Sequence, residues 1–218
     1  MAREIRITPS ILNADRNNLQ SEITRIAEES DLIHLDVMDN IFVPNFTFDF
    51  DRATEIIRDC PIPVDAHLMV AEVDESARAY AQAGAASVTI HVEATRNVKD
   101  TAKAIRRAGA RAAIALKPKS RIEDYADFLG EVDMVLIMTV EPGFGGQQFM
   151  SEMLPKVEAA RKLIGDRPIW LQVDGGISLE TIEQAATAGA DTFVAGSAVF
   201  RADDPAAMIR ALRSAVLE

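Results

Sequence analysis

Residues 97–116 read NVKDTAKAIRRAGARAAIAL and contain one complete structural unit. The first part places Val98, Ala102 and Ile105 at helical spacing. Gly109 follows, at a position where a helix commonly ends in the left-handed conformation that glycine adopts most easily. The apolar run at 112–116 has the length of a buried parallel strand. This stretch therefore predicts a helix over 97–108 and a strand over 112–116.

The same order of strand, polar turn and helix repeats along the rest of the chain. The tripeptide Ala-Gly-Ala recurs at 83–85, 108–110 and 188–190, each time before a predicted strand. The predicted strands are 5–12, 32–38, 63–69, 87–91, 112–116, 134–139, 169–173 and 192–195. The predicted helices are 17–29, 51–58, 74–83, 97–108, 121–129, 154–164, 179–188 and 205–216. Two helix starts carry cap signals, a capping box at Ser120 and Glu123 and the pair Asp204-Pro205.

Eight strands that alternate with eight helices, at roughly 27 residues a unit, fit a closed (β/α)8 or TIM barrel. A doubly wound open sheet is the alternative, but such sheets usually have fewer strands. The chain has 218 residues, of which 48% are hydrophobic and 26% charged, as in ordinary globular proteins. No linker or shift in composition marks a second part, so we expect one α/β domain over residues 1–218.

The charge and cysteine content narrow the possible partners and location. Acidic residues outnumber basic ones 34 to 23, which gives a net charge of −11 at pH 7. Such a chain repels nucleic acid and anionic membranes unless its basic residues cluster, so we expect neither as a partner. The single cysteine, Cys60, and the absence of a signal-peptide pattern at residues 1–6 favour the cytoplasm. Exposed apolar surface on the outer helices of a barrel would favour association between copies, so we expect a homo-oligomer.

Polar side chains interrupt the apolar strands at their C-terminal ends, where barrel enzymes carry their sites. Because side chains alternate between the two faces of a strand, His34 and Asp36 share one face of the second predicted strand. His67 holds the matching place on the third strand, and Asp174 directly follows the seventh. Such a buried cluster is costly without a cation and suits Zn²⁺, Fe²⁺, Mn²⁺ or Co²⁺. We therefore expect one bound divalent metal ion.

Other residues at predicted strand ends receive different interpretations. His91 has no polar companion within its own strand and is interpreted as structural. Met38, Met69 and Met138 also lie at strand ends, where methionine often simply fills a core. If they line the floor of the site, they would form an apolar, polarisable wall that excludes water.

Glycine-rich turns follow the sixth, seventh and eighth predicted strands. Their sequences are EPGFGGQ at 141–147, DGG at 174–176 and AGS at 195–197. Backbone N–H groups in such turns bind phosphate, and barrels usually place a phosphate site after these strands. The dinucleotide fingerprint G-x-G-x-x-G is absent, because Gln148 occupies its third glycine position. The turns therefore favour a phosphorylated small molecule over a nucleotide.

Several of these segments resemble the ribulose-phosphate 3-epimerase family. The resemblance is carried, in family order, by TPSIL at 8–12, HLDVMD at 34–39, FVPN at 42–45, DAHLM at 65–69, MTVEPGFGGQ at 138–147, VDGGI at 173–177 and AGSA at 195–198. The chain departs from the family pattern in the loop at 40–50. There Asn40 replaces a glycine, Ile41 replaces a polar residue or histidine, and Phe48-Asp49-Phe50 replaces a frequent Gly-Pro pair.

The resemblance implies a metal-dependent barrel that interconverts D-ribulose 5-phosphate and D-xylulose 5-phosphate through an enediolate. His34, Asp36, His67 and Asp174 would hold the metal. Asp36 and Asp174 would also be the catalytic residues, each exchanging the carbon 3 proton on one face of the planar intermediate. The implied substrate-binding residues are Ser10, His67, Gly143, Phe144, Gly145, Gly146, Asp174, Gly175, Gly176, Gly196 and Ser197.

Two other functions stay open as alternatives, and two more are disfavoured by the residues present. An epimerase of a longer ketose such as D-allulose 6-phosphate would use the same residues, and the changed loop at 40–50 allows it. A Schiff-base aldolase would use Lys117 at the end of the fifth predicted strand, although a lysine there is more often on the rim. A phosphosugar sensor would not need two carboxylates for proton transfer. A related decarboxylase would need the array Asp-x-Lys-x-x-Asp, which the strand ending at Met38-Asp39 lacks.

Overall fold

The computed structural model describes residues 4–217 and contains one sheet of eight parallel strands. Residues 1–3 and residue 218 lie outside the described range. The predicted domain and the stretch without a signal-peptide pattern both begin within residues 1–3. The strands are Arg6–Thr8 (β1), Ile33–Met38 (β2), Val64–Met69 (β3), Ser87–His91 (β4), Arg111–Leu116 (β5), Met134–Met138 (β6), Trp170–Asp174 (β7) and Thr192–Val194 (β8).

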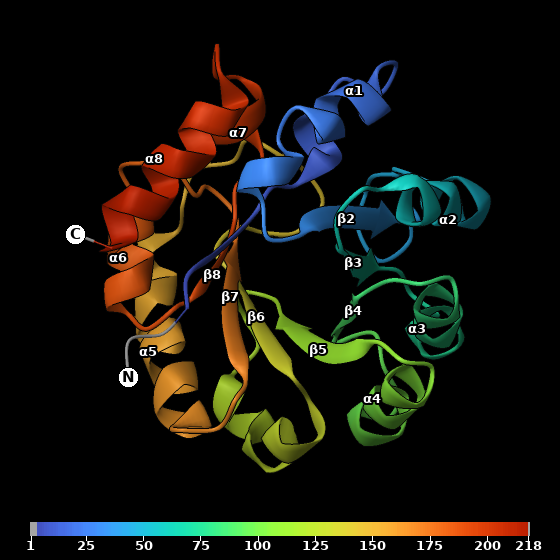
Figure 1. The fold of residues 1–218 in the computed structure, drawn as a ribbon. Helices are drawn as coiled ribbons and strands as arrows, with labels where there is room; N and C mark the ends of the chain where they lie inside the picture. Colours follow the sequence, from blue (N-terminus) through green and yellow to red (C-terminus); the bar gives the residue numbers. More distant parts are fainter. Residues whose placement is uncertain (1–3, 218) are drawn as a thin grey trace.

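The sheet closes on itself. Its strand order is β1-β8-β7-β6-β5-β4-β3-β2, so neighbours in the chain are neighbours in the sheet (Figure 1). The two end strands meet through a parallel bridge between Ser10 and His34, where the His34 N–H donates to the Pro9 carbonyl at 2.9 Å. A doubly wound sheet would reverse its order at a switch point. The predicted (β/α)8 barrel is therefore confirmed.

Helices cover the outside of the barrel (Figure 1). They are Leu19–Thr24 (α1), Phe50–Asp59 (α2), Val73–Gln82 (α3), Val98–Arg107 (α4), Leu154–Ile164 (α5), Ile182–Thr187 (α6), Ser197–Phe200 (α7) and Pro205–Leu217 (α8). Short 3-10 helices span Ile11–Asn13 (η1), Ala27–Glu29 (η2), Ile122–Glu131 (η3) and Ser151–Met153 (η4). Within residues 4–217, no helix is long and apolar enough to cross a membrane.

One helix start was predicted wrongly and one correctly. The capping box expected at Ser120 does not form, because the Ser120 hydroxyl donates to Glu93 and η3 begins after Arg121 without a side-chain cap. Apolar residues in η3 recur every third position, which suits a 3-10 helix. Asp204 does cap α8, since its Oδ1 accepts the Ala207 N–H at 3.0 Å.

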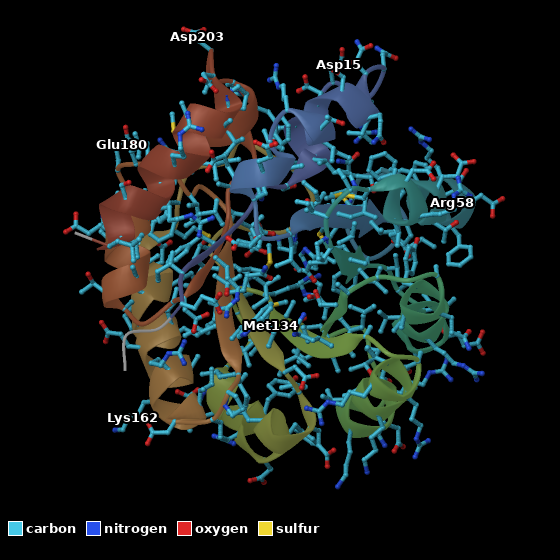
Figure 2. The ribbon with its side chains drawn as sticks, in the orientation of Figure 1. Asp15, Arg58, Met134, Lys162, Glu180 and Asp203 are labelled. Carbon is cyan, nitrogen blue, oxygen red and sulfur yellow. The ribbon has the colours of Figure 1, made fainter. Side chains whose placement is uncertain are left out.

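The two faces of each strand meet different surroundings. On β2, Ile33, Leu35 and Val37 face outward into the main apolar core beneath the helices. His34 and Asp36 alternate with them and are buried inside the barrel. Charged side chains such as Arg58 and Lys162 stand at the outer surface, whereas Met134 lies within the barrel (Figure 2). The pleat of the strand thus separates an apolar packing face from a polar interior.

Three aspartates, here called the aspartate clamps, join neighbouring strands at the N-terminal end of the barrel. Asp191, just before β8, accepts the Leu171 N–H of β7 at 3.0 Å and pairs with Arg161 of α5 at 2.6 Å. The other two clamps have the same two contacts: Asp31 with the Ile7 N–H (2.8 Å) and Arg213 (2.9 Å), and Asp133 with the Ala112 N–H (2.9 Å) and Arg106 (2.7 Å). Each clamp holds two strands and one helix together, far from the C-terminal strand ends.

We expect Asp191→Ala to destabilise the fold by about 3 kcal/mol, because it takes the carboxylate away from both the Leu171 N–H and the largely buried Arg161 guanidinium. Urea unfolding followed by circular dichroism measures the change. Asp59→Ala is the control, since Asp59 pairs with Arg58 but both side chains are more than half exposed. Equal midpoints for the two variants would show that the clamp does not hold the barrel.

Candidate active site

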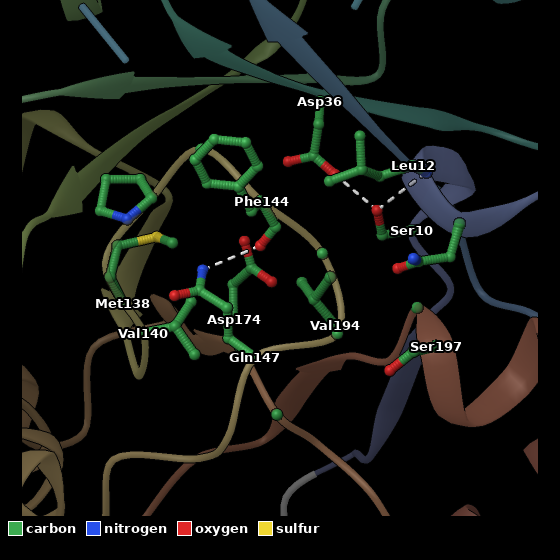
Figure 3. Close-up of a pocket in the computed structure, with 18 of the residues that line it drawn as sticks. Ser10, Leu12, Asp36, Met138, Val140, Phe144, Gln147, Asp174, Val194 and Ser197 are labelled. Atoms are coloured by element: carbon green, nitrogen blue, oxygen red, sulfur yellow. Dashed lines mark hydrogen bonds between the residues drawn. The ribbon is translucent and has the colours of Figure 1, made fainter. Parts of the chain in front are cut away.

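The C-terminal ends of the strands surround a small, partly open cavity (Figure 3). Most of the residues singled out from the sequence line it. They are Ser10, Asp36, Met38, Met69, Met138, Gly143, Phe144, Gly145, Gly146, Asp174, Gly175, Gly176, Gly196 and Ser197. His34 and His67 are fully buried directly beneath it, in contact with Asp36.

The two histidines and two aspartates converge on one point. His34 Nε2 lies 3.2 Å from His67 Nδ1, and these atoms lie 3.4 and 3.1 Å from Asp36 Oδ1. Asp174 Oδ2 completes the group at 3.8 Å from His34 Nε2 and 3.7 Å from His67 Nδ1. Four ligands around a tetrahedral Zn²⁺ are spaced about 3.4 Å apart. The donor types and their spacing therefore fit a divalent cation.

A buried hydrogen-bond network orients His34. Its Nδ1–H donates to Asp65 Oδ2 at 3.0 Å, so Nε2 is the ring nitrogen that faces the cluster and would offer its lone pair to a cation once the ring is neutral. Asp65 also accepts from the hydroxyls of Ser87 and Thr89 and from the Gln172 amide, at 2.7, 3.0 and 3.2 Å. A carboxylate behind a ligating histidine is a common support in metal sites. Alternation along the strand puts Asp65 on the same face as His67, but the sequence pattern does not indicate this supporting role.

His91 contacts the cluster from the neighbouring strand. Its Nε2 lies 2.9 Å from His67 Nε2, and its Nδ1 lies 3.2 Å from Glu93 Oε2. Burial lowers the pKa of His91 to about 4, so its imidazole is neutral near pH 7. The sequence interpretation of His91 as structural missed this contact, because its companion lies on β3 and not within β4.

The environments of Asp36 and Asp174 move their pKa values in opposite directions. Burial raises the pKa of Asp174 to about 6, and the charge of Asp36 adds to the effect. Burial acts on Asp36 in the same sense, but the charges and hydrogen bonds of His34 and His67 outweigh it and hold the pKa of Asp36 far below its usual range. The same ion pairing, helped by Asp65, raises the pKa of His34 well above its usual value against the effect of burial.

Ser10 connects the barrel seam to this cluster. Its hydroxyl donates to Asp36 Oδ2 and accepts the Leu12 N–H at 3.2 Å (Figure 3). Asp36 is therefore held with Oδ2 on Ser10 and Oδ1 toward His67. Ser10 takes this position because it caps η1 directly after β1.

Side-chain amides hold the glycine-rich loop at 141–147. Gln147 Nε2 donates to the Phe144 carbonyl at 2.9 Å (Figure 3) and to the Glu141 carbonyl at 2.7 Å. Asn45 Nδ2 donates to the Gly143 carbonyl at 2.8 Å and so ties this loop to the one after β2. Gln147 in the glycine-rich motif and Asn45 in the motif FVPN were the signals that could have predicted this support.

Asn13 is a cavity residue that the sequence reasoning missed. Its side chain lies between two of the glycine turns, so that a Cβ on Gly145 or Gly196 would stand 2.5 or 2.9 Å from its Oδ1. Glycine at these two positions therefore lets the turns approach η1 closely. The position of Asn13, three residues after Ser10, was the available signal.

The loop at 40–50, where the chain departs from the family pattern, has defined contacts. Asn40 adopts a φ of 59°, the left-handed conformation that asparagine tolerates. Asp39 Oδ1 accepts the N–H groups of Ile41 and Phe42 at 2.8 and 2.9 Å, and Asp49 caps α2 through the Arg52 N–H. Ile41 is 78% exposed.

Lys117, the candidate Schiff-base residue, lies outside the group that lines the cavity. Its Nζ stands 3.6 Å from the centre of the Phe42 ring, a cation–π contact. The structure therefore places this lysine on the rim and does not favour the aldolase alternative.

Fold and site together define an α/β barrel in which two histidines and two aspartates form a group that could hold a metal ion, with glycine turns at the same mouth. A family model described as "Ribulose-phosphate 3 epimerase family" matches residues 6–200. The chain belongs to this family.

Individual comparisons agree. The chain is 50% identical over 209 residues to the ribulose-phosphate 3-epimerase of Mycobacterium tuberculosis H37Rv, covering 95% of this chain and 91% of that protein. It is 39% identical over 220 residues to the cytoplasmic isoform of ribulose-phosphate 3-epimerase from Oryza sativa subsp. japonica, covering 99% of this chain and 96% of that protein. Among solved structures, KGPDC from Streptococcus mutans superposes with a TM-score of 0.71 at 16% identity, covering 99% of this chain and 98% of that one. That likeness supports the fold alone.

We expect Gly176→Ala to lower stability and to raise KM for a phosphorylated ketose. The residue has a φ of +69°, and an added Cβ would stand 2.4 Å from the Phe149 backbone nitrogen, so the turn must move. Gly109→Ala is the control, because Gly109 also has a positive φ, +99°, but nothing within 4 Å of an added Cβ. The control should lose only the stability that alanine costs at a positive φ, about 1–2 kcal/mol, and its KM should be unchanged. A Gly176 variant indistinguishable from it would show that this turn does not shape the cavity.

Proposed function

We propose that this chain interconverts D-ribulose 5-phosphate and D-xylulose 5-phosphate by inverting the configuration at carbon 3. Membership of the family supports this reaction. The observation that carries the proposal is that Asp36 of β2 and Asp174 of β7 reach one cavity from different sides of the barrel (Figure 3). Inversion needs proton transfer on both faces of the reacting carbon, and two such carboxylates provide it.

We infer that His34, Asp36, His67 and Asp174 hold one divalent cation, of the Zn²⁺, Fe²⁺, Mn²⁺ or Co²⁺ type. Their donor atoms all lie within 4.8 Å of one another, and nitrogen–oxygen sets of this kind suit these ions. When bound, such a cation would place positive charge beside the ketose oxygens and make the carbon 3 proton more acidic.

The carboxylates carry out the proton transfers. In one direction Asp36 removes the carbon 3 proton and leaves a planar enediolate, and Asp174 returns a proton to the opposite face. In the other direction the two residues exchange roles. Ser10 orients Asp36 through the hydrogen bond to Oδ2, so that its second oxygen stays toward the cluster.

The remaining cavity residues would position the substrate. The backbone N–H groups of Gly143, Gly145, Gly146, Gly175, Gly176, Gly196 and Ser197 would bind the phosphate. Ser10 would contact the sugar, and Phe144 is 54% exposed at the mouth beside the phosphate turn. The resemblance also implies a sugar contact for His67, but this residue is fully buried beneath the cavity, so we propose only its role as a cation ligand. Met38, Met69 and Met138 line the cavity and would form its apolar floor.

We also propose that the protein acts in the cytoplasm as a homo-oligomer. The free thiol of Cys60 suits a reducing compartment, and the rice relative is a cytoplasmic isoform. Ile41, Phe46 and Phe50 expose large apolar side chains near the start of α2, as an interface would. The net charge of −11 supports neither a nucleic-acid nor a membrane partner.

We expect the purified, metal-loaded protein to convert D-ribulose 5-phosphate in D₂O to D-xylulose 5-phosphate carrying deuterium at carbon 3. Proton NMR follows both the loss of the carbon 3 signal and the appearance of product. Chelation should stop the reaction, and returning the cation should restore it. Exchange limited to D-allulose 6-phosphate would instead support the epimerase of the longer sugar, and no exchange with either ketose would overturn the function.

Asp174→Asn should abolish epimerisation, with a fall in kcat of at least about 100-fold, because one face of the intermediate loses its proton-transfer group. Asp36 should still exchange the carbon 3 proton of the epimer whose proton faces it, so NMR in D₂O should show exchange without inversion. Metal content is measured in parallel, and Asp203→Asn, on the exposed surface, is the control. Near wild-type turnover by the Asp174 variant would refute the two-carboxylate mechanism.

A further inference from the structure

A chain of three side chains leads from the proposed metal site to the loop after β5. His67 directs Nδ1 at Asp36 and His34, while its other ring nitrogen, Nε2, lies 2.9 Å from His91 Nε2. His91 Nδ1 in turn lies 3.2 Å from Glu93 Oε2. At both contacts one atom must donate a proton and the other must accept it, so the directions of the two hydrogen bonds are linked.

Glu93 sets the direction of the chain. Its Oε1 accepts the Lys117 N–H at 2.9 Å and also the Ser120 hydroxyl, as expected of an ionised carboxylate. Because the carboxylate only accepts, His91 Nδ1 must be the donor in the contact with Oε2. The Lys117–Ser120 loop is itself held, since Lys156 Nζ donates to the carbonyls of Lys117 and Pro118 at 3.0 and 2.7 Å.

The direction carries through to His67. A neutral His91 that is protonated on Nδ1 has its lone pair on Nε2, where it accepts the Nε2–H of His67. His67 then has Nδ1 available for a cation, as the Asp65 hydrogen bond makes Nε2 of His34 available. A His67 that binds a cation through Nδ1 carries its proton on Nε2. If His91 also carried its proton on Nε2, two N–H groups would face each other at this contact, and cation binding would have to break it.

We propose that Glu93 and His91 are positioning residues, which fix the protonated nitrogen of His67 so that its Nδ1 lone pair is available to a divalent cation. Neither residue contacts the substrate cavity in this arrangement. The inference rests on the proposed metal-dependent function.

The decisive variant is Glu93→Gln, which keeps the shape but adds a donor. The amide oxygen must occupy the Oε1 position, because the Lys117 N–H and the Ser120 hydroxyl donate there, so the amide NH₂ faces His91 Nδ1. His91 should then accept at Nδ1 and carry its proton on Nε2. We expect affinity for Co²⁺ alone, measured by visible absorption against a competing chelator, to fall about 10–100-fold.

Long-range ¹H–¹⁵N NMR of histidine-labelled protein reads the tautomers directly, and the chain has only 3 histidines to assign. Wild-type His91 should be neutral with its proton on Nδ1, both in chelated protein and with Zn²⁺, whereas Glu93→Gln should show the proton on Nε2 in chelated protein. The matched control is Asp74→Asn, which removes an equal charge from a carboxylate that holds Thr95 and Thr101 but contacts none of the three histidines. It should keep the wild-type tautomers and Co²⁺ affinity within about twofold of wild type.

Wild-type His91 protonated on Nε2, or Glu93→Gln with unchanged Co²⁺ affinity, would overturn the inference. These measurements need no substrate, so they separate it from the proposed reaction. Wild-type protein that epimerises while Glu93→Gln binds Co²⁺ normally would refute the inference and leave the function intact. If Glu93→Gln weakens Co²⁺ binding as expected but the wild-type protein does not epimerise, the proposed function is refuted and the inference stands.

Discussion

The alternation of side chains along a β-strand is the constraint on which this molecule depends. On β2 it sends Ile33, Leu35 and Val37 outward to the helices and His34 and Asp36 inward. A shift by one residue would bury the histidine and the aspartate under helices and place a leucine in the barrel interior. Closure at Ser10 and His34 then fixes where the inward side chains of β2, β3 and β7 meet. Packing and chemistry are therefore set by the same register.

What could be predicted from the sequence is what depends on local periodicity. The repeated units predict the barrel, and alternation alone brings His34, Asp36 and His67 to one interior. The link between His67 and His91 could not be predicted this way, because it depends on the stagger between two strands. Asn13 lies in a turn whose path no periodicity determines. The start of η3 was also missed. Ser120 and Glu123 have the spacing of a capping box, but the Ser120 hydroxyl binds Glu93, a distant residue that local periodicity does not bring near.

The cavity combines two different ways of meeting negative charge. At the barrel axis, buried carboxylates are balanced by histidines and would be balanced further by a cation. At the glycine turns, none of the described residues that line the cavity is a lysine or arginine, so a phosphate there would meet backbone dipoles, with Arg201 as a cation beside them: a Cβ on Gly146 would stand 3.4 Å from its Nη2. Backbone N–H groups are neutral dipoles that do not titrate near neutral pH, and they cannot swing away as long side chains do. Such a site would hold one end of a phosphorylated ligand still while protons move at the other.

The aspartate clamps lie at the opposite end of the barrel from the cavity, which has a consequence for how this protein can diverge. Their partners are strand N–H groups and helix arginines, and none belongs to the loop at 40–50 or to the glycine turns. Mutations in the mouth loops can therefore accumulate without loosening the strand pairs beneath them. Selection for a new sugar could act on the loop at 40–50 while the scaffold below is inherited unchanged.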